Sequence, residues 1–121
     1  MKRDMDLVRK ILLEATAREG AYAGKNPTIE GYSDDQVAHH VYLMKQGGLV
    51  EATVWRPLDG SPPIAHLTNV TWEGHDFLDA ARSETVWNQS MAKARAASVD
   101  LSIATLKELL VATAKSALGL P

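Results

Sequence analysis

Residues 33–56 read SDDQVAHHVYLMKQGGLVEATVWR, and this segment is the most informative one about the fold. Ser33 followed by Gln36 is a capping-box pattern that begins a helix, and the apolar residues after it recur at helical spacing on one face. The glycine pair at 47–48 indicates a helix end, because glycine readily adopts the left-handed conformation of a helix cap. Residues rich in β-formers follow directly. The stretch therefore predicts a helix over 33–46 and a strand after it.

A second strand is predicted to complete a hairpin. Residues 57–63 read PLDGSPP, which is a strong turn signal, and residues 64–68 favour the return strand. A helix, a glycine end and a hairpin follow one another in the second half of a winged helix. That fold is often used to read DNA.

The residues before this stretch predict the first half of the domain. Apolar periodicity predicts a helix over 4–18, with Asp4 as its N-cap. Residues 27–30 favour a short strand in which Ile29 is buried. We therefore expect an α+β, winged-helix-like domain over 1–82, in the order helix, short strand, helix and β-hairpin wing.

The rest of the chain predicts helices. Thr71 is expected to cap a helix over 72–82, a fourth helix follows Ser83, and Asp100 is expected to open the last one. The apolar residues of this last helix cover more than one stripe, so it needs burial on two sides. We expect residues 83–121 to form a C-terminal helical extension that packs on the domain, within one globular unit, or forms a homodimer.

The composition and charge of the chain limit the classes of function that are possible. The chain has 121 residues, with 13 basic and 15 acidic residues and a net charge of −2. DNA-binding domains usually carry a basic excess, so the overall charge argues mildly against DNA. The absence of cysteine excludes disulfides and thiolate metal sites. No stretch resembles a signal peptide or a membrane span of about 18 apolar residues, so we expect a cytoplasmic protein without membrane partners.

Three blocks of sequence carry a family resemblance. They are RDMDLVRKILLE at 3–14, EGYSDDQVAHHVYLMKQGGLVEA at 30–52 and TWEGHDFLDAARSETVWN at 71–88. With these blocks the chain resembles a family of small uncharacterised bacterial and phage proteins with a winged-helix fold. The resemblance implies a fold and no activity. The chain departs from DNA-reading winged helices between residues 20 and 32, where a helix that supports the recognition helix would be needed.

The outward face of the helix over 33–46 is the candidate binding surface. Its polar side chains are placed to contact base edges, and the two nearby cations are placed to contact phosphates. Contact with a protein through the same face is the alternative, and the acidic Asp34 and Asp35 at the helix start argue for it. The predicted nucleic-acid or partner-binding residues are His39, Tyr42, Leu43, Lys45, Gln46 and Arg56.

The chain offers few candidates for metal binding, ligand binding or catalysis. His39 and His40 are adjacent, and neighbouring helical positions point about 100° apart, so we expect no metal and assign His40 a hydrogen-bonded place at the core edge. Trp55, Trp72 and Trp87 are expected in the core or in a seam between the hairpin and the C-terminal helices, with a ligand pocket as the alternative. No phosphate loop, nucleophile elbow or carboxylate pair is present, so no enzyme and no cofactor are predicted.

Two functions therefore remain open. The first is a transcriptional regulator that binds double-stranded DNA through the helix over 33–46. The second is a protein-interaction module that keeps the winged-helix frame and has lost the DNA-binding surface.

Overall fold

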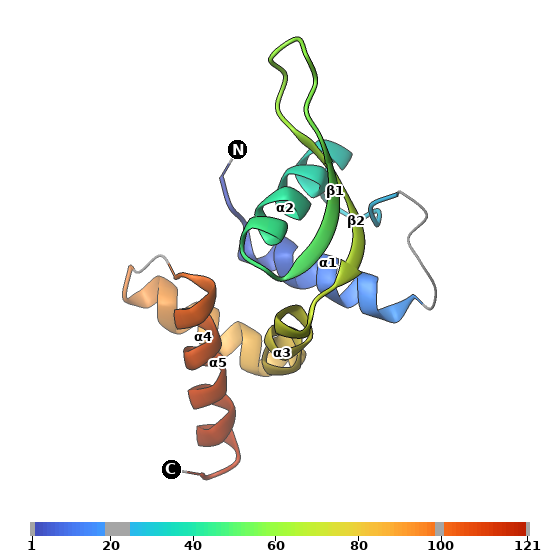
Figure 1. Cartoon of the computed structure of the whole chain (residues 1–121). Helices are drawn as coiled ribbons and strands as arrows, with labels where there is room; N and C mark the ends of the chain where they lie inside the picture. Colours follow the sequence, from blue (N-terminus) through green and yellow to red (C-terminus); the bar gives the residue numbers. More distant parts are fainter. Residues whose placement is uncertain (1, 19–24, 99–100, 121) are drawn as a thin grey trace. The chain divides into compact units, whose positions relative to one another are not determined.

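The computed structural model describes residues 2–18, 25–98 and 101–120, and it contains helices and one antiparallel hairpin (Figure 1). The chain divides into two compact units, Met1–His75 and Asp76–Pro121. The predicted α+β class is confirmed. No helix within the described ranges has the length and apolar character needed to cross a membrane. The elements in chain order are α1 (Met5–Ala17), α2 (Asp34–Gln46), β1 (Val50–Trp55), β2 (Ile64–Val70), α3 (Trp72–Ala81), α4 (Glu84–Ala96) and α5 (Ile103–Ala117).

The first unit begins with α1, which confirms the helix predicted near the N-terminus. The Asp4 side chain accepts hydrogen bonds from the backbone N–H groups of Asp6 (2.9 Å) and Leu7 (3.2 Å). These bonds satisfy amide groups that have no partner inside the helix. The apolar face of α1 is buried and packs on α2 and β2. Its residues are Leu7, Val8, Ile11, Leu12 and Ala15.

Helix α2 forms as its sequence pattern predicts. The Gln36 N–H donates to Ser33 Oγ (3.1 Å), and the Ser33 N–H donates to Gln36 Oε1 (2.8 Å), which completes the capping box. At the other end, Gly47 caps the helix and Gly48 takes a left-handed φ of +78°. Val37, Val41 and Met44 are buried, and α2 packs against both strands of the hairpin and against α1.

The sheet consists of β1 and β2, which pair antiparallel. The pairing shifts between Glu51 and Ala52, so that Thr68 on β2 has no partner and forms a bulge. Ala65 and Leu67 of β2 are fully buried, while His66, Thr68 and Asn69 are exposed. The hairpin thus has one buried face and one open face, and its connecting loop projects beyond the helices of the first unit (Figure 1).

The short strand predicted at 27–30 is wrong, because the described residues between α1 and α2 contain no strand. The Asn26 side chain makes the hydrogen bonds to the edge of β2 that a third strand would make. Its amide donates to the Ala65 carbonyl (2.8 Å) and accepts from the Leu67 N–H (2.8 Å), which satisfies the open edge of β2. Pro27 has no N–H to continue such a ladder. Ile29 is buried, as expected.

The start of α3 is fixed to the hairpin by Thr71. Its hydroxyl donates to the Gly48 carbonyl and accepts from the Gly74 N–H (3.1 Å), and its own N–H donates to the Leu49 carbonyl (3.0 Å). This confirms Thr71 as the predicted cap. A Cβ atom at position 74 would collide with the Leu49 carbonyl oxygen and would lie 2.8 Å from Val70 Cγ1. Only glycine fits where α3 crosses the backbone before β1.

We predict that Gly74→Ala destabilises the protein. Alanine is a better helix former than glycine by about 1 kcal/mol. Overpacking typically costs about 1 to 3 kcal/mol and occasionally more, and the atom that collides here belongs to backbone that cannot rotate away. The collision should therefore dominate, and urea unfolding should show a net loss of stability. Glu73→Ala, at the exposed neighbouring position, should leave the midpoint nearly unchanged. A Gly74→Ala protein as stable as the Glu73→Ala control would contradict the close crossing.

The second unit contains the end of α3 together with α4 and α5. Phe77 and Trp87 pack edge to face, with ring centroids 6.4 Å apart at 86°. Leu106 and Leu110 of α5 are fully buried, and α5 packs against α4. Ser102 caps α5, whereas Asp100, the predicted opening residue, lies outside the described residues.

The prediction for the tryptophans holds for one of the three. Trp87 is buried, but Trp55 is 63 % exposed and Trp72 is 80 % exposed, so the core or seam placement is wrong for both. Trp55 occupies an outward position of β1, next to the more buried Val54. Trp72 begins α3, two residues before the buried Gly74, and therefore points away from the packed face.

Candidate functional site

The candidate surface lies on α2, and His40 holds that helix in place. The imidazole is 1 % exposed. Its Nε2 accepts from the Asp4 N–H (2.8 Å), and its Nδ1 lies 2.8 Å from the Gln36 carbonyl oxygen. Because Nε2 accepts and the carbonyl needs a donor, His40 is the neutral tautomer with its proton on Nδ1. The ring thus joins α2 to the start of α1, as expected of a hydrogen-bonded core histidine.

Tyr32 adds a second link to Asp4. Its hydroxyl donates to Asp4 Oδ2 (3.0 Å), and the Lys10 ammonium lies 5.4 Å from the ring centroid. Burial raises the pKa of Tyr32 above its ordinary value of 10.0, and the hydrogen bond to Asp4 and the negative charges of Asp4 and Asp6 raise it further. The folded state therefore favours the neutral phenol.

The Tyr32 contact predicts a loss of stability at high pH. A pKa that is higher in the folded state gives stability that is complete below pH 10 and disappears as the pH rises through the folded value. The difference in unfolding free energy between wild type and Tyr32→Phe should be constant from neutral pH to mildly alkaline pH. It should shrink above pH 10. Chemical denaturation across this range measures it, and a difference that stays constant at higher pH would contradict the assignment.

Four of the six predicted binding residues meet at one place. Tyr42, Lys45 and Gln46 from the last two turns of α2, and Arg56 just after β1, line a hollow of about 470 Å³. Val54 completes the lining. The sequence reasoning missed Val54, although strand alternation places residues 54 and 56 on the same side.

The charged groups of this hollow are arranged for contact with an anion. Arg56 Nη2 donates to the Tyr42 hydroxyl (3.2 Å), and its guanidinium carbon lies 5.8 Å from the Tyr42 ring centroid. Lys45 is exposed in the last turn of α2. Within the described ranges, neither Lys45 nor Arg56 forms an ion pair with a carboxylate. Two cations therefore remain available beside an amide and an aromatic ring.

The other two predicted residues lie outside this hollow. His39 is half-buried, with its ring edge-on to that of His40 at 5.8 Å. Leu43 is also half-buried. Across the described part of the chain, no cluster of three histidine or carboxylate side chains is placed to hold a metal ion.

The loop of the hairpin presents apolar surface instead of cations. Leu58 is fully exposed at the tip, close in sequence to the exposed Trp55. Asp59 accepts a hydrogen bond from the Ser61 N–H (2.9 Å), which tightens the turn, and the hydrogen bonds from Ser61 hold the pKa of Asp59 below its ordinary value. The loop therefore presents an exposed leucine and one carboxylate close in sequence to Arg56.

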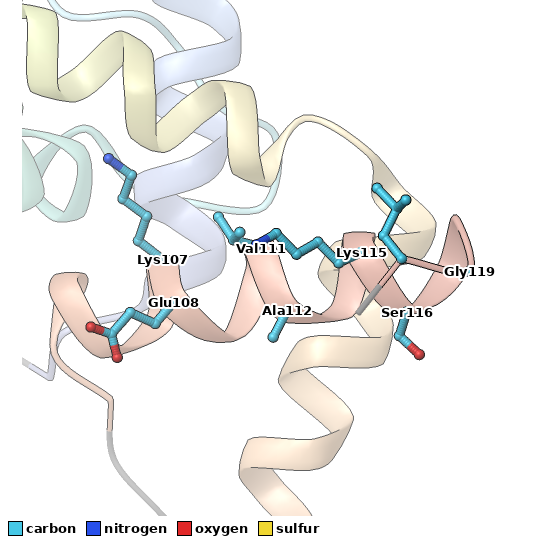
Figure 2. Close-up of a pocket in the computed structure, with 8 residues that line it drawn as sticks. Lys107, Glu108, Val111, Ala112, Lys115, Ser116 and Gly119 are labelled. Atoms are coloured by element: carbon cyan, nitrogen blue, oxygen red, sulfur yellow. The ribbon is translucent and has the colours of Figure 1, made fainter.

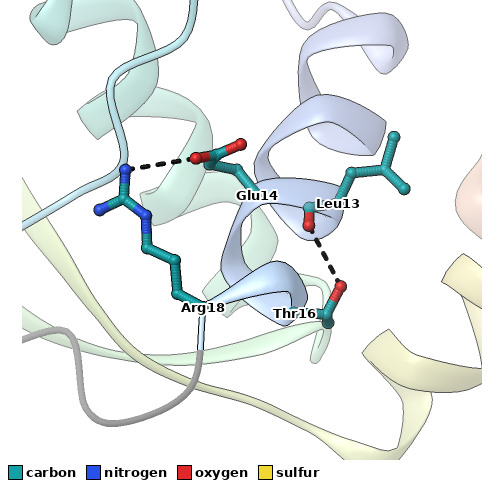
Figure 3. Close-up of polar contacts among 4 residues, drawn as sticks. All are labelled: Leu13, Glu14, Thr16 and Arg18. Carbon is teal, nitrogen blue, oxygen red and sulfur yellow. Dashed lines mark hydrogen bonds and ion pairs between the residues drawn. The ribbon is translucent and has the colours of Figure 1, made fainter.

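A second, smaller hollow of about 220 Å³ lies between the end of α1 and β2. Its cation, Arg18, is paired with Glu14 (3.2 Å), and the Thr16 hydroxyl bonds to the carbonyls of Leu12 (2.9 Å) and Leu13 (3.3 Å) (Figure 3). These polar groups already have local partners. The hollow beside Tyr42 is therefore the stronger candidate site.

Comparison with known proteins places the chain in a family. A family model described as a hypothetical protein, DUF2513, matches residues 2–100. The chain belongs to the DUF2513 family. An uncharacterised protein of Haemophilus influenzae is 36 % identical over 110 residues, which cover 90 % of this chain and 92 % of that protein. No solved structure matches. The expected membership of an uncharacterised family is thus confirmed.

Proposed function

We propose that this DUF2513 protein is a small, non-catalytic, cytoplasmic DNA-binding module of a winged-helix-like type, which acts in transcription regulation in a bacterium or phage. The observation that carries the proposal is the hollow formed by Tyr42, Lys45, Gln46 and Arg56. It joins two cations, which have no carboxylate partner among the described residues, to an amide and a hydroxyl. These are the groups that proteins use on phosphates and on base edges.

In this proposal, DNA meets the C-terminal end of α2 and the start of the hairpin loop. Lys45 and Arg56 contact phosphates of the backbone, and Gln46 and the Tyr42 hydroxyl face the groove. Asp34 and Asp35 lie at the other end of α2. A rise of 1.5 Å per residue places them about 16 Å from Lys45. That distance exceeds the Debye length of about 8 Å at physiological salt, so the acidic pair opposes the contact only weakly.

The proposal predicts weak binding with a shallow salt dependence. Each neutralised phosphate contributes about −0.9 to the slope of log K against log salt concentration, so two contacts give about −1.8. Fluorescence anisotropy with a random duplex, at low and then moderate salt, measures the slope. Lys45→Gln and Arg56→Gln should each remove about half of it, and the double variant should lose binding.

Lys25→Gln provides the matched control. Lys25 is an exposed cation of the same unit and lies outside the hollow. Its loss should leave the slope unchanged. The proposal is overturned if the wild type fails to bind at low salt, or if the double variant binds like the Lys25→Gln control.

A second candidate function rests on the apolar tip of the hairpin. Trp55 is 63 % exposed and Leu58 is fully exposed. Tryptophan is enriched where proteins bind each other, and Leu58 adds exposed apolar area close to it in sequence. In this alternative the chain is a protein-interaction module, and the hairpin provides the contact.

The alternative predicts a partner that depends on the hairpin and not on the cations. Pull-down from the native host should retain a protein with the wild type and with the Lys45→Gln/Arg56→Gln variant. Trp55→Ser combined with Leu58→Ser should lose it. The same set of retained proteins for all three would count against the hairpin as a contact surface.

A further inference from the structure

Helix α5 has two different faces. Leu106, Leu110 and Thr113 are buried on one side, where the Lys93 ammonium lies 3.4 Å from the Thr113 hydroxyl. The opposite side lines a hollow of about 820 Å³ that runs from Lys107 to Leu120 (Figure 2). The outward side therefore has the form of a groove.

The outward side ends in an ordered apolar cap. The Leu120 N–H donates to the Lys115 carbonyl (2.8 Å), the Gly119 N–H donates to the Ser116 carbonyl (3.1 Å), and Gly119 has a φ of +73°. This is a Schellman cap. It holds Leu120 against the groove, where it is 54 % exposed, together with Val111 at 39 %.

We propose that this groove binds a second copy of the chain, with the two α5 helices antiparallel. Charge complementarity supports this arrangement. Glu108 and Lys115 lie two helical turns apart on the groove, and Val111 and Ala112 lie between them. A two-fold axis that passes between residues 111 and 112 brings Glu108 opposite Lys115 of the partner subunit, and Lys115 opposite Glu108 of the partner subunit.

The same axis places small and apolar groups at the centre. Val111 meets Ala112 of the partner subunit, and the small side chains of Ala112 and Ser116 allow the close approach that packed helices need. Within the described ranges, neither Glu108 nor Lys115 has an ion-pair partner in its own chain. A parallel pair would place like charges opposite each other, which is unfavourable. The charges therefore select the antiparallel arrangement.

One helix pair buries little surface, so the dimer should be weak and concentration-dependent. The dimer is independent of the proposed DNA binding, because α5 shares no residue with the hollow beside Tyr42. The two proposals can therefore fail separately.

The test uses charge reversal and sedimentation equilibrium of the full chain without DNA, at micromolar to millimolar concentrations. Wild type should form a reversible dimer. Glu108→Lys alone and Lys115→Glu alone should each weaken it about tenfold or more, because like charges then face each other twice. An equimolar mixture of these two variants should form heterodimers, since every facing pair is again opposite in sign.

The double variant Glu108→Lys/Lys115→Glu should recover the wild-type dimer. Glu51→Lys, at an exposed site of β1, is the matched control and should dimerise like wild type. Circular dichroism checks that each variant is folded. A wild type that stays monomeric at millimolar concentration overturns the proposal. The antiparallel arrangement is overturned if the single charge reversals leave dimerisation unchanged. It is also overturned if the two single variants do not form heterodimers when mixed.

Discussion

The buried imidazole of His40 is the interaction on which the first unit depends. It accepts from the Asp4 N–H and faces the Gln36 carbonyl, so it fixes α2 against the start of α1 at atomic distance. Asp4 also caps α1 and accepts from Tyr32. The start of α1, the helix α2 and the segment that contains Tyr32 are thus joined through the Asp4 residue and the His40 ring. A buried polar group needs its hydrogen-bond partners, so these bonds favour the one position of α2 in which His40 is satisfied.

The candidate site follows from that placement. Once α2 is fixed, its last turns bring Tyr42, Lys45 and Gln46 beside Arg56. The acidic residues stay at the other end of the helix, so a chain of net charge −2 still presents a locally cationic hollow. Net charge describes the whole chain, whereas an anion responds to the charges within about one Debye length. A slightly negative net charge is therefore compatible with a cationic hollow in the same domain.

Parts of this arrangement were readable from sequence and parts were not. The capping box at Ser33, the Asp4 cap and the Thr71 cap were predicted because each depends on residues a few positions apart. The short strand was wrong because the Asn26 side chain pairs with β2 across about forty residues. Trp55 and Trp72 were misplaced because hydrophobicity alone does not show which face of a strand or helix a residue occupies. His39 and Leu43 were predicted as binding residues because they lie near the others on α2, but they do not line the hollow. Val54 lines the hollow and was not predicted.

Local hydrogen bonds and periodicity were enough to predict the helices, the hairpin, their order and the caps at Asp4, Ser33 and Thr71. Three further features come from packing between distant segments: His40 binds the Asp4 amide, Gly74 crosses the backbone at Leu49, and four of the predicted residues share one hollow. Each of these depends on atoms that the chain brings together from distant positions. Local pattern carries no information on such distances, because they are fixed by the packing of whole elements.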